Sequence, residues 1–157
     1  MREHEFRSEL WLQCPREDVF SFFGDALNLQ SITPAFLHFV VVTPLPIVMR
    51  KGTLIDYKLR LHGFPVRWQT LISAWEPPHR FVDEQLRGPY RRWIHEHTFE
   101  ECDGGTMTRD YVRYAVPGGA LIERLFVRRD LEAIFAFRAQ QLRELLGSPP
   151  CPARTNK

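Results

Sequence analysis

Two histidines separated by one residue, His95 and His97, have the type and spacing best suited to acid–base or ligand-binding chemistry in this sequence. Imidazole gains and loses a proton near neutral pH. Residues two apart on a strand share a face, and from Tyr90 to Glu101 both histidines share the face of Trp93 and Phe99. We therefore predict that both rings point inward, although a single β-bulge before Trp93 would reverse this placement.

Acidic partners for the histidines come from the neighbouring predicted strands. The alternation of polar and apolar residues places Asp110 on the inner face of strand 106–116 and Asp83 on the inner face of strand 80–87. A histidine oriented by an aspartate can act as a general acid–base, can orient a ligand, or can be part of a purely structural pair. Two close histidines should also titrate as a coupled pair. The candidate catalytic residues are His95, His97 and Asp110.

The inner faces of the predicted strands also carry many large aromatic side chains. Buried polar groups among them need partners, water or a ligand. An apolar cavity with a few convergent polar groups is typical of a small-molecule site. The predicted ligand-binding residues are Tyr57, Trp68, Phe81, Gln85, Trp93, His95, His97, Phe99, Asp110, Tyr114, Phe135 and Arg138.

A metal site is not predicted. The His-x-His arrangement supplies two ligands on one face of a strand, but no motif identifies the third ligand that a site would need. We therefore expect neither a metal nor a cofactor.

One long helix must close the inner face of the sheet. From Ala120 to Leu146 apolar residues recur at three- and four-residue steps, with Arg138 in the middle of the apolar stripe. Such a charge is costly unless it is paired or hydrated. The upstream apolar residues are out of phase, which predicts a bend at residues 128–130 with Asp130 capping the second piece. The piece before the bend would then be a mobile flap.

The rest of the chain is predicted to form strands and two short helices. A strand over residues 5–12 precedes helices that begin at Pro15 and over residues 26–32. Further strands are predicted over residues 36–43, 53–62, 66–75, 80–87, 90–101 and 106–116, separated by glycine- and proline-containing turns. The fold class is therefore α+β, an antiparallel sheet against a long C-terminal helix, with two short helices after strand 1.

Length and composition narrow the class of protein. A chain of 157 residues suits one domain, which we assign to residues 1–147, with a flexible tail over 148–157. A net charge of +2, from 21 basic and 19 acidic residues, gives no basis for binding nucleic acid. Neither a signal peptide nor a membrane-spanning run is present, so no membrane insertion is expected. Three cysteines predict unpaired thiols, no disulfide and a cytoplasmic location.

Several ordered segments resemble one family. They are residues 14–20 (CPREDVF), 75–78 (WEPP), 81–85 (FVDEQ), 88–90 (GPY), 93–99 (WIHEHTF) and 104–106 (GGT). Over residues 6–146 the chain resembles the SRPBCC group of the Bet v 1-like/START superfamily, in particular bacterial polyketide cyclase/dehydrase and lipid-transport-like proteins. The resemblance implies a helix-grip fold, in which a curved seven-stranded sheet wraps the C-terminal helix around a cavity.

The resemblance also implies the binding of a hydrophobic or amphipathic small molecule, such as a lipid, a polyketide or a quinone-like compound. It does not imply one reaction. The alternative is a polyketide cyclase or dehydratase in which a cavity histidine is the general acid–base. A third possibility is a non-catalytic partner of another protein. Whether the chain is an enzyme, and its oligomeric state, stay open.

Overall fold

The computed structural model describes residues 1–147, so the predicted tail over 148–157 lies outside the described residues. Seven strands form one sheet in the order β1-β7-β6-β5-β4-β3-β2, and all neighbouring strands are antiparallel. Their bounds are β1 His4–Leu12, β2 Val40–Val41, β3 Leu54–Leu61, β4 Phe64–Glu76, β5 Arg80–Arg87, β6 Arg92–Cys102 and β7 Gly105–Ala115. The predicted seven-stranded antiparallel sheet is confirmed.

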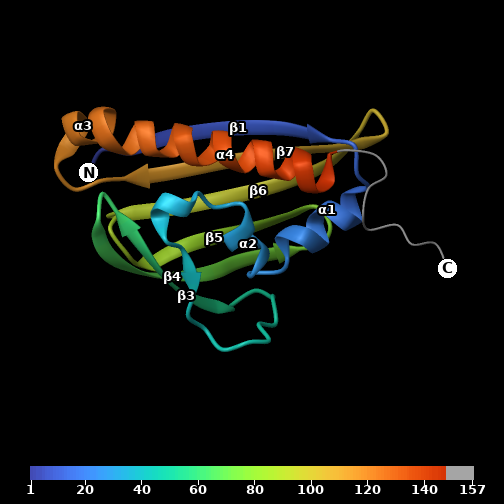
Figure 1. Ribbon diagram of the computed structural model, residues 1–157, viewed down its shortest axis with the longest axis horizontal. Helices are drawn as coiled ribbons and strands as arrows, with labels where there is room; N and C mark the ends of the chain where they lie inside the picture. The colour runs from blue at the N-terminus through green and yellow to red at the C-terminus, as the bar shows by residue number, and fades with distance from the viewer. Residues whose placement is uncertain (148–157) are drawn as a thin grey trace.

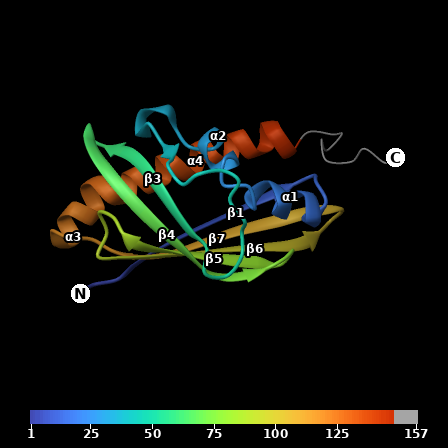
Figure 2. The same cartoon turned by 90° about the horizontal axis from the view of Figure 1, so that it is seen from below.

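Helices cover the concave face of this sheet. The short helices after β1 are α1 Arg16–Phe23 and α2 Asn28–Ser31, followed by the 3-10 turn η1 Ala35–Leu37. The C-terminal helical run consists of α3 Gly119–Ile122, the π-helical segment η2 Glu123–Val127, and α4 Arg128–Leu146. Figures 1 and 2 show α4 lying along the inside of the curved sheet, with α1 beside its C-terminal half. This is the predicted helix-grip arrangement.

Local sequence explains where several elements begin and end. Pro15 immediately precedes α1 and Gly24 follows it, as expected for a proline near a helix start and a glycine past its end. The β6–β7 hairpin turns through Asp103 and Gly104, both with positive φ, which is the pattern of a two-residue type I′ turn. The strand predicted over residues 36–43 is wrong for most of its length, because η1 and flanking prolines leave only Val40–Val41 paired to β3.

The phase slip in the C-terminal helix has a different cause from the one predicted. The backbone stays helical through Val127 and Arg128, so the predicted joint at residues 128–130 is wrong. The preceding η2 segment is π-helical, and a π-helical turn holds about one residue more than an α-helical turn, which rotates the apolar stripe. Asp130 does not cap a helix, and its Oδ2 lies 2.8 Å from His62 Nε2.

The cysteines also differ from the prediction. Cys14, at the end of β1, is buried and disulfide-bonded, whereas Cys102 carries a free thiol. The prediction of no disulfide is therefore wrong, because separation along the chain does not report separation in space.

In the described part of the chain, no helix is long and apolar enough to cross a membrane.

Three clusters of buried apolar residues make up the core. One joins α1 and the end of α4 to the sheet, around Phe20, Phe81 and Leu142. A second joins the start of α4 to β1 and β7, around Phe6 and Phe135. The third lies on β3 and β4, around Ile55 and Ile72. Residues of all three clusters line one cavity. The clusters therefore do not fill the space between the sheet and the helix completely, and the cavity lies between them.

Candidate functional site

The cavity between the sheet and α4 has a volume of about 170 Å³. Its walls come from the inner faces of β3, β4, β5 and β6, from α1 and α2, and from α4. Eight of the predicted ligand-binding residues line it: Tyr57, Trp68, Phe81, Trp93, His95, His97, Phe135 and Arg138. The other four do not.

Those four residues support the cavity from outside. The Gln85 side chain donates to the backbone oxygen of Tyr90 and accepts from its N–H, which fixes the β5–β6 turn. Phe99 packs in the core cluster near α1. The Tyr114 hydroxyl donates to Glu123 in the π-helical segment. Asp110 on β7 contacts both histidines and lies 3.9 Å from Arg138, but it does not line the cavity.

Sequence reasoning missed most of the apolar lining. Ile55 and Leu59 on β3 share the face of Tyr57, so the alternation that identified Tyr57 also identifies them. Phe23 of α1 and Leu29 of α2 line the cavity as well, but helical periodicity shows only that they are buried. Which side of a short helix borders a cavity depends on where that helix docks.

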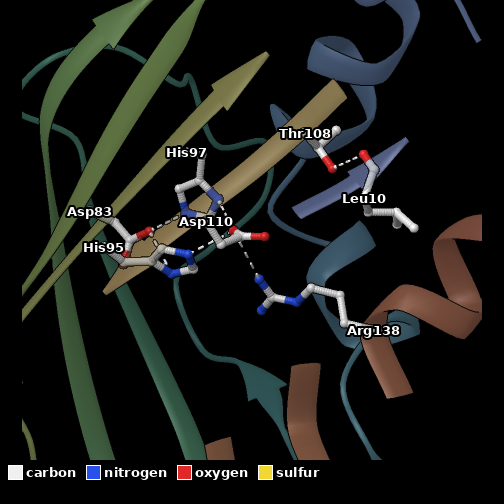
Figure 3. A network of polar contacts seen from close by, with 7 residues as sticks. All are labelled: Leu10, Asp83, His95, His97, Thr108, Asp110 and Arg138. Carbon is white, nitrogen blue, oxygen red and sulfur yellow. Dashed lines mark hydrogen bonds and ion pairs between the residues drawn. The ribbon is translucent and has the colours of Figure 1, made fainter. Parts of the chain in front are cut away.

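Four polar side chains from three adjacent strands meet on the inner face of the sheet (Figure 3). The strand register pairs Asp83 with His95, and His97 with Asp110. The shortest contacts run diagonally instead. His97 Nε2 lies 2.7 Å from Asp83 Oδ2, and His95 Nε2 lies 2.8 Å from Asp110 Oδ1. The cluster therefore links β5, β6 and β7.

The second nitrogen of each histidine also faces a carboxylate. His95 Nδ1 lies 3.8 Å from Asp83 Oδ2. His97 Nδ1 lies 3.1 Å from Asp110 Oδ1 but has no hydrogen-bond partner among the described residues. The centroids of the two imidazoles are 3.7 Å apart with the ring planes tilted by 30°, and Phe81 stacks on His97. The two residues are 4% and 5% exposed and line the cavity, so the predicted inward placement is confirmed.

Arg138 enters the same region from α4 and is only 9% exposed. Its Nη1 lies 3.9 Å from Asp110 Oδ1, and its guanidinium lies 4.9 Å from the centre of the Phe135 ring. The guanidinium therefore lies beside the polar cluster (Figure 3). Its Nε and Nη1 have no hydrogen-bond partner among the described residues. A guanidinium donates in a planar fork that matches a carboxylate, so Arg138 has donors available to an anion.

The two histidines differ in their electrostatics. Burial, together with the neighbouring His97, lowers the pKa of His95. Burial alone would also lower the pKa of His97, but the carboxylates of Asp110 and Asp83 outweigh it and raise that pKa. Burial would raise the pKa of each aspartate, yet attraction to the histidines holds the pKa of both carboxyls below the ordinary value. The cluster thus favours ionised carboxylates and one protonated imidazole.

The arrangement permits three kinds of chemistry. A histidine held between carboxylates can transfer a proton, and the cluster with Arg138 can orient a polar ligand group at the end of an apolar cavity. Ligand atoms of Asp83, His95 and His97 also all lie within 4.8 Å of one another, close enough to share a metal ion. No motif in the sequence identified a third ligand, although Asp83 was predicted as an acidic partner of the histidines; the structure brings it within reach of both rings.

No protein-family model and no curated protein matches this chain. Solved structures do match it. The protein designated TTHA0849 from Thermus thermophilus is 21% identical with a TM-score of 0.72, over 90% of this chain and 95% of that chain. Major latex-like protein 151 from Panax ginseng is 9% identical with a TM-score of 0.68, over 90% and 96%.

A third match covers only part of a larger protein. A nucleoside-diphosphate sugar epimerase from Corynebacterium glutamicum is 23% identical with a TM-score of 0.66, over 88% of this chain and 28% of that chain. At these identities the matches establish the fold. They show the same arrangement of a curved sheet around a long C-terminal helix.

Proposed function

We propose that this helix-grip fold binds a small amphipathic molecule, with an apolar ring system and an acidic group, in the cavity between the sheet and α4. The observation that carries the proposal is Arg138, a buried cation with unpartnered N–H donors in a wall that is otherwise mainly apolar. A buried charged donor without an acceptor is costly. A bound anion would supply the acceptor, and the aromatic lining would bury the apolar part.

The cavity volume limits the size of that molecule. The volume is about 170 Å³, which is close to the roughly 150 Å³ of an engineered apolar cavity that binds benzene. One ring or two fused rings match this size, whereas a long acyl chain would extend beyond it. Among lipid, polyketide and quinone-like ligands, the proposal therefore favours a compact ring-containing acid.

Native mass spectrometry of freshly purified protein tests the proposal. We expect a complex heavier than the polypeptide that releases an acidic small molecule on denaturation. Arg138→Met, purified in parallel, should carry less of that molecule, while Arg143→Met on the exposed face of α4 should carry as much as wild type. Protein that carries no small molecule and also fails to bind an added aromatic acid such as 1-naphthoate would overturn the proposal.

A second candidate is an acid–base enzyme acting on an enolisable carbonyl compound. The observation that favours it is that each imidazole lies beside a carboxylate that can orient it. His95→Gln separates the two functions once a ligand is identified. Lost turnover with affinity within a few-fold of wild type supports the enzyme, whereas weakened binding with no lost reaction supports the binding protein.

A further inference from the structure

We propose that Asp83, His95 and His97 bind a divalent transition-metal ion at the wall of the cavity. All three residues line the cavity, and their ligand atoms lie within 4.8 Å of one another. Two imidazoles and one carboxylate form a donor set used by zinc and by non-haem iron. The inference goes beyond the binding of an organic molecule and does not require it.

Distances within the trio are close to those that a metal requires. Zinc–nitrogen and zinc–oxygen bonds of about 2.0–2.2 Å place two ligand atoms of one ion roughly 3.0–3.5 Å apart. Asp83 Oδ2 lies 2.7 Å from His97 Nε2 and 3.8 Å from His95 Nδ1. These two separations fall on either side of the required range. The ligand atoms of the two histidines lie within 4.8 Å of each other, so a bound ion would require the side chains to adjust from the positions seen here.

Asp110 occupies the position of an outer carboxylate that orients both imidazoles. It does not line the cavity. Its Oδ1 lies 2.8 Å from His95 Nε2 and 3.1 Å from His97 Nδ1, the two ring nitrogens that face away from Asp83. Histidine ligands commonly donate their second N–H to such a carboxylate, which leaves the first nitrogen as the metal ligand. Asp110 makes this hydrogen bond with His95, whereas His97 Nδ1 lies 3.1 Å from the same oxygen without forming one among the described residues.

The donor types indicate the class of metal. Magnesium and calcium prefer sets of oxygen ligands, whereas imidazole nitrogen with carboxylate oxygen suits zinc, iron and related ions. Three protein ligands leave at least one coordination position open, and the trio faces the cavity. Asp83 and Asp110 would balance the charge of a divalent ion. The adjacent Arg138 would then favour an anion at the open position.

The competing interpretation is that the four residues form a structural cluster that needs no ion. A second histidine–aspartate pair in the chain provides the matched control. His62 Nε2 lies 2.8 Å from Asp130 Oδ2, but this pair is more exposed. It belongs to no group of three candidate metal ligands among the described residues. A cation that binds any histidine–aspartate pair would therefore bind there too.

Titration of untagged, chelator-treated protein with Co²⁺ alone tests the inference. We expect one Co²⁺ per chain, visible absorption bands of a low-coordinate site, and displacement by Zn²⁺. His97→Gln and Asp83→Asn should abolish the bands, and Asp110→Asn should weaken binding by about 10-fold or more. His62→Gln should bind as wild type does. No saturable binding, or equal binding by all variants, would overturn the inference.

A measurement on wild type keeps the test valid if the variants fail to fold. Long-range nitrogen–proton NMR spectra report each imidazole nitrogen, and Zn²⁺ should shift His95 Nδ1 and His97 Nε2 together. Shifts confined to other histidines would contradict the site. Binding of 1-naphthoate without any binding of Co²⁺ or Zn²⁺ would remove the metal inference and leave the proposed function intact.

Discussion

Asp83 and His97 lie diagonally across neighbouring strands, yet their Oδ2 and Nε2 atoms are only 2.7 Å apart. The carboxylate reaches past its register partner, His95. Diagonal neighbours on a sheet are within reach of long side chains. Because His95 makes the opposite diagonal contact with Asp110, the cluster forms only when β5, β6 and β7 are all paired.

The diagonal contact should stabilise the fold. Asp83→Asn replaces a charged acceptor by a neutral one beside His97, and we expect it to lower the free energy of unfolding by about 1–3 kcal/mol. Asp130→Asn, at the more exposed His62 pair, should cost less than about 1 kcal/mol. Urea unfolding of both variants measures the difference. Equal losses would show that the inner cluster contributes no more than a surface pair.

Arg138 should discriminate between charged and neutral ligands. Arg138→Met removes the guanidinium but keeps an apolar side chain, so the affinity for 1-naphthoate should fall by roughly 10- to 100-fold, as expected for a charge-assisted hydrogen bond. The affinity for 1-naphthylmethanol should change little. Titration calorimetry with both compounds measures this. A similar loss for the neutral alcohol would mean that Arg138 shapes the cavity and does not pair with an anion.

Aromatic residues that line the cavity should differ from those that only fill the core. Trp93→Ala and Phe135→Ala remove cavity walls and should weaken 1-naphthoate binding. Phe99→Ala removes a ring from the same face of β6 that only packs in the core. It should cost stability, about 3–5 kcal/mol for a packed ring, with affinity unchanged. The cavity is misplaced if Trp93→Ala and Phe135→Ala lose only stability.

Tyr114 should anchor the π-helical segment. Its hydroxyl donates a hydrogen bond to the carboxylate of Glu123, a residue that is only 8% exposed. Tyr114→Phe leaves that acceptor short of a donor and should cost about 1–3 kcal/mol. Tyr111→Phe, which removes an exposed hydrogen bond to Glu5, should be close to neutral. Unfolding experiments on the pair compare them, and amide exchange over residues 119–127 should quicken only for Tyr114→Phe.

Much of the fold follows from periodicity in the sequence. Two-residue alternation placed His95 and His97 on the inner face, and the helical stripe placed Arg138 opposite them. Alternation gives only the face of each residue. It does not show that Asp83 contacts His97 diagonally, or that Asp110 contacts both rings without lining the cavity. These facts depend on strand register and on the curvature of the sheet.

The predictions from the sequence that proved wrong or incomplete concern the C-terminal helix, the cysteines and the apolar lining of the cavity, and each has a physical reason. A phase slip in the apolar stripe fits either a break or a π-helical turn, and the sequence alone does not distinguish them. Cys14 forms a disulfide although the cysteines are widely spaced in the chain. The unfilled volume between three core clusters depends on how α1, α2 and α4 dock, so most apolar lining residues could be predicted only as buried.

Isoleucine methyl groups provide the most direct test of binding in the cavity. Ile32, Ile55, Ile72 and Ile134 line it, whereas Ile47, Ile94 and Ile122 do not. Methyl NMR spectra recorded during titration with 1-naphthoate would report all seven isoleucines at once. We expect saturable shifts at the four cavity isoleucines with Ile94 and Ile122 unchanged. Shifts confined to Ile94 or Ile122, or no saturable shift at any cavity isoleucine, would contradict the account.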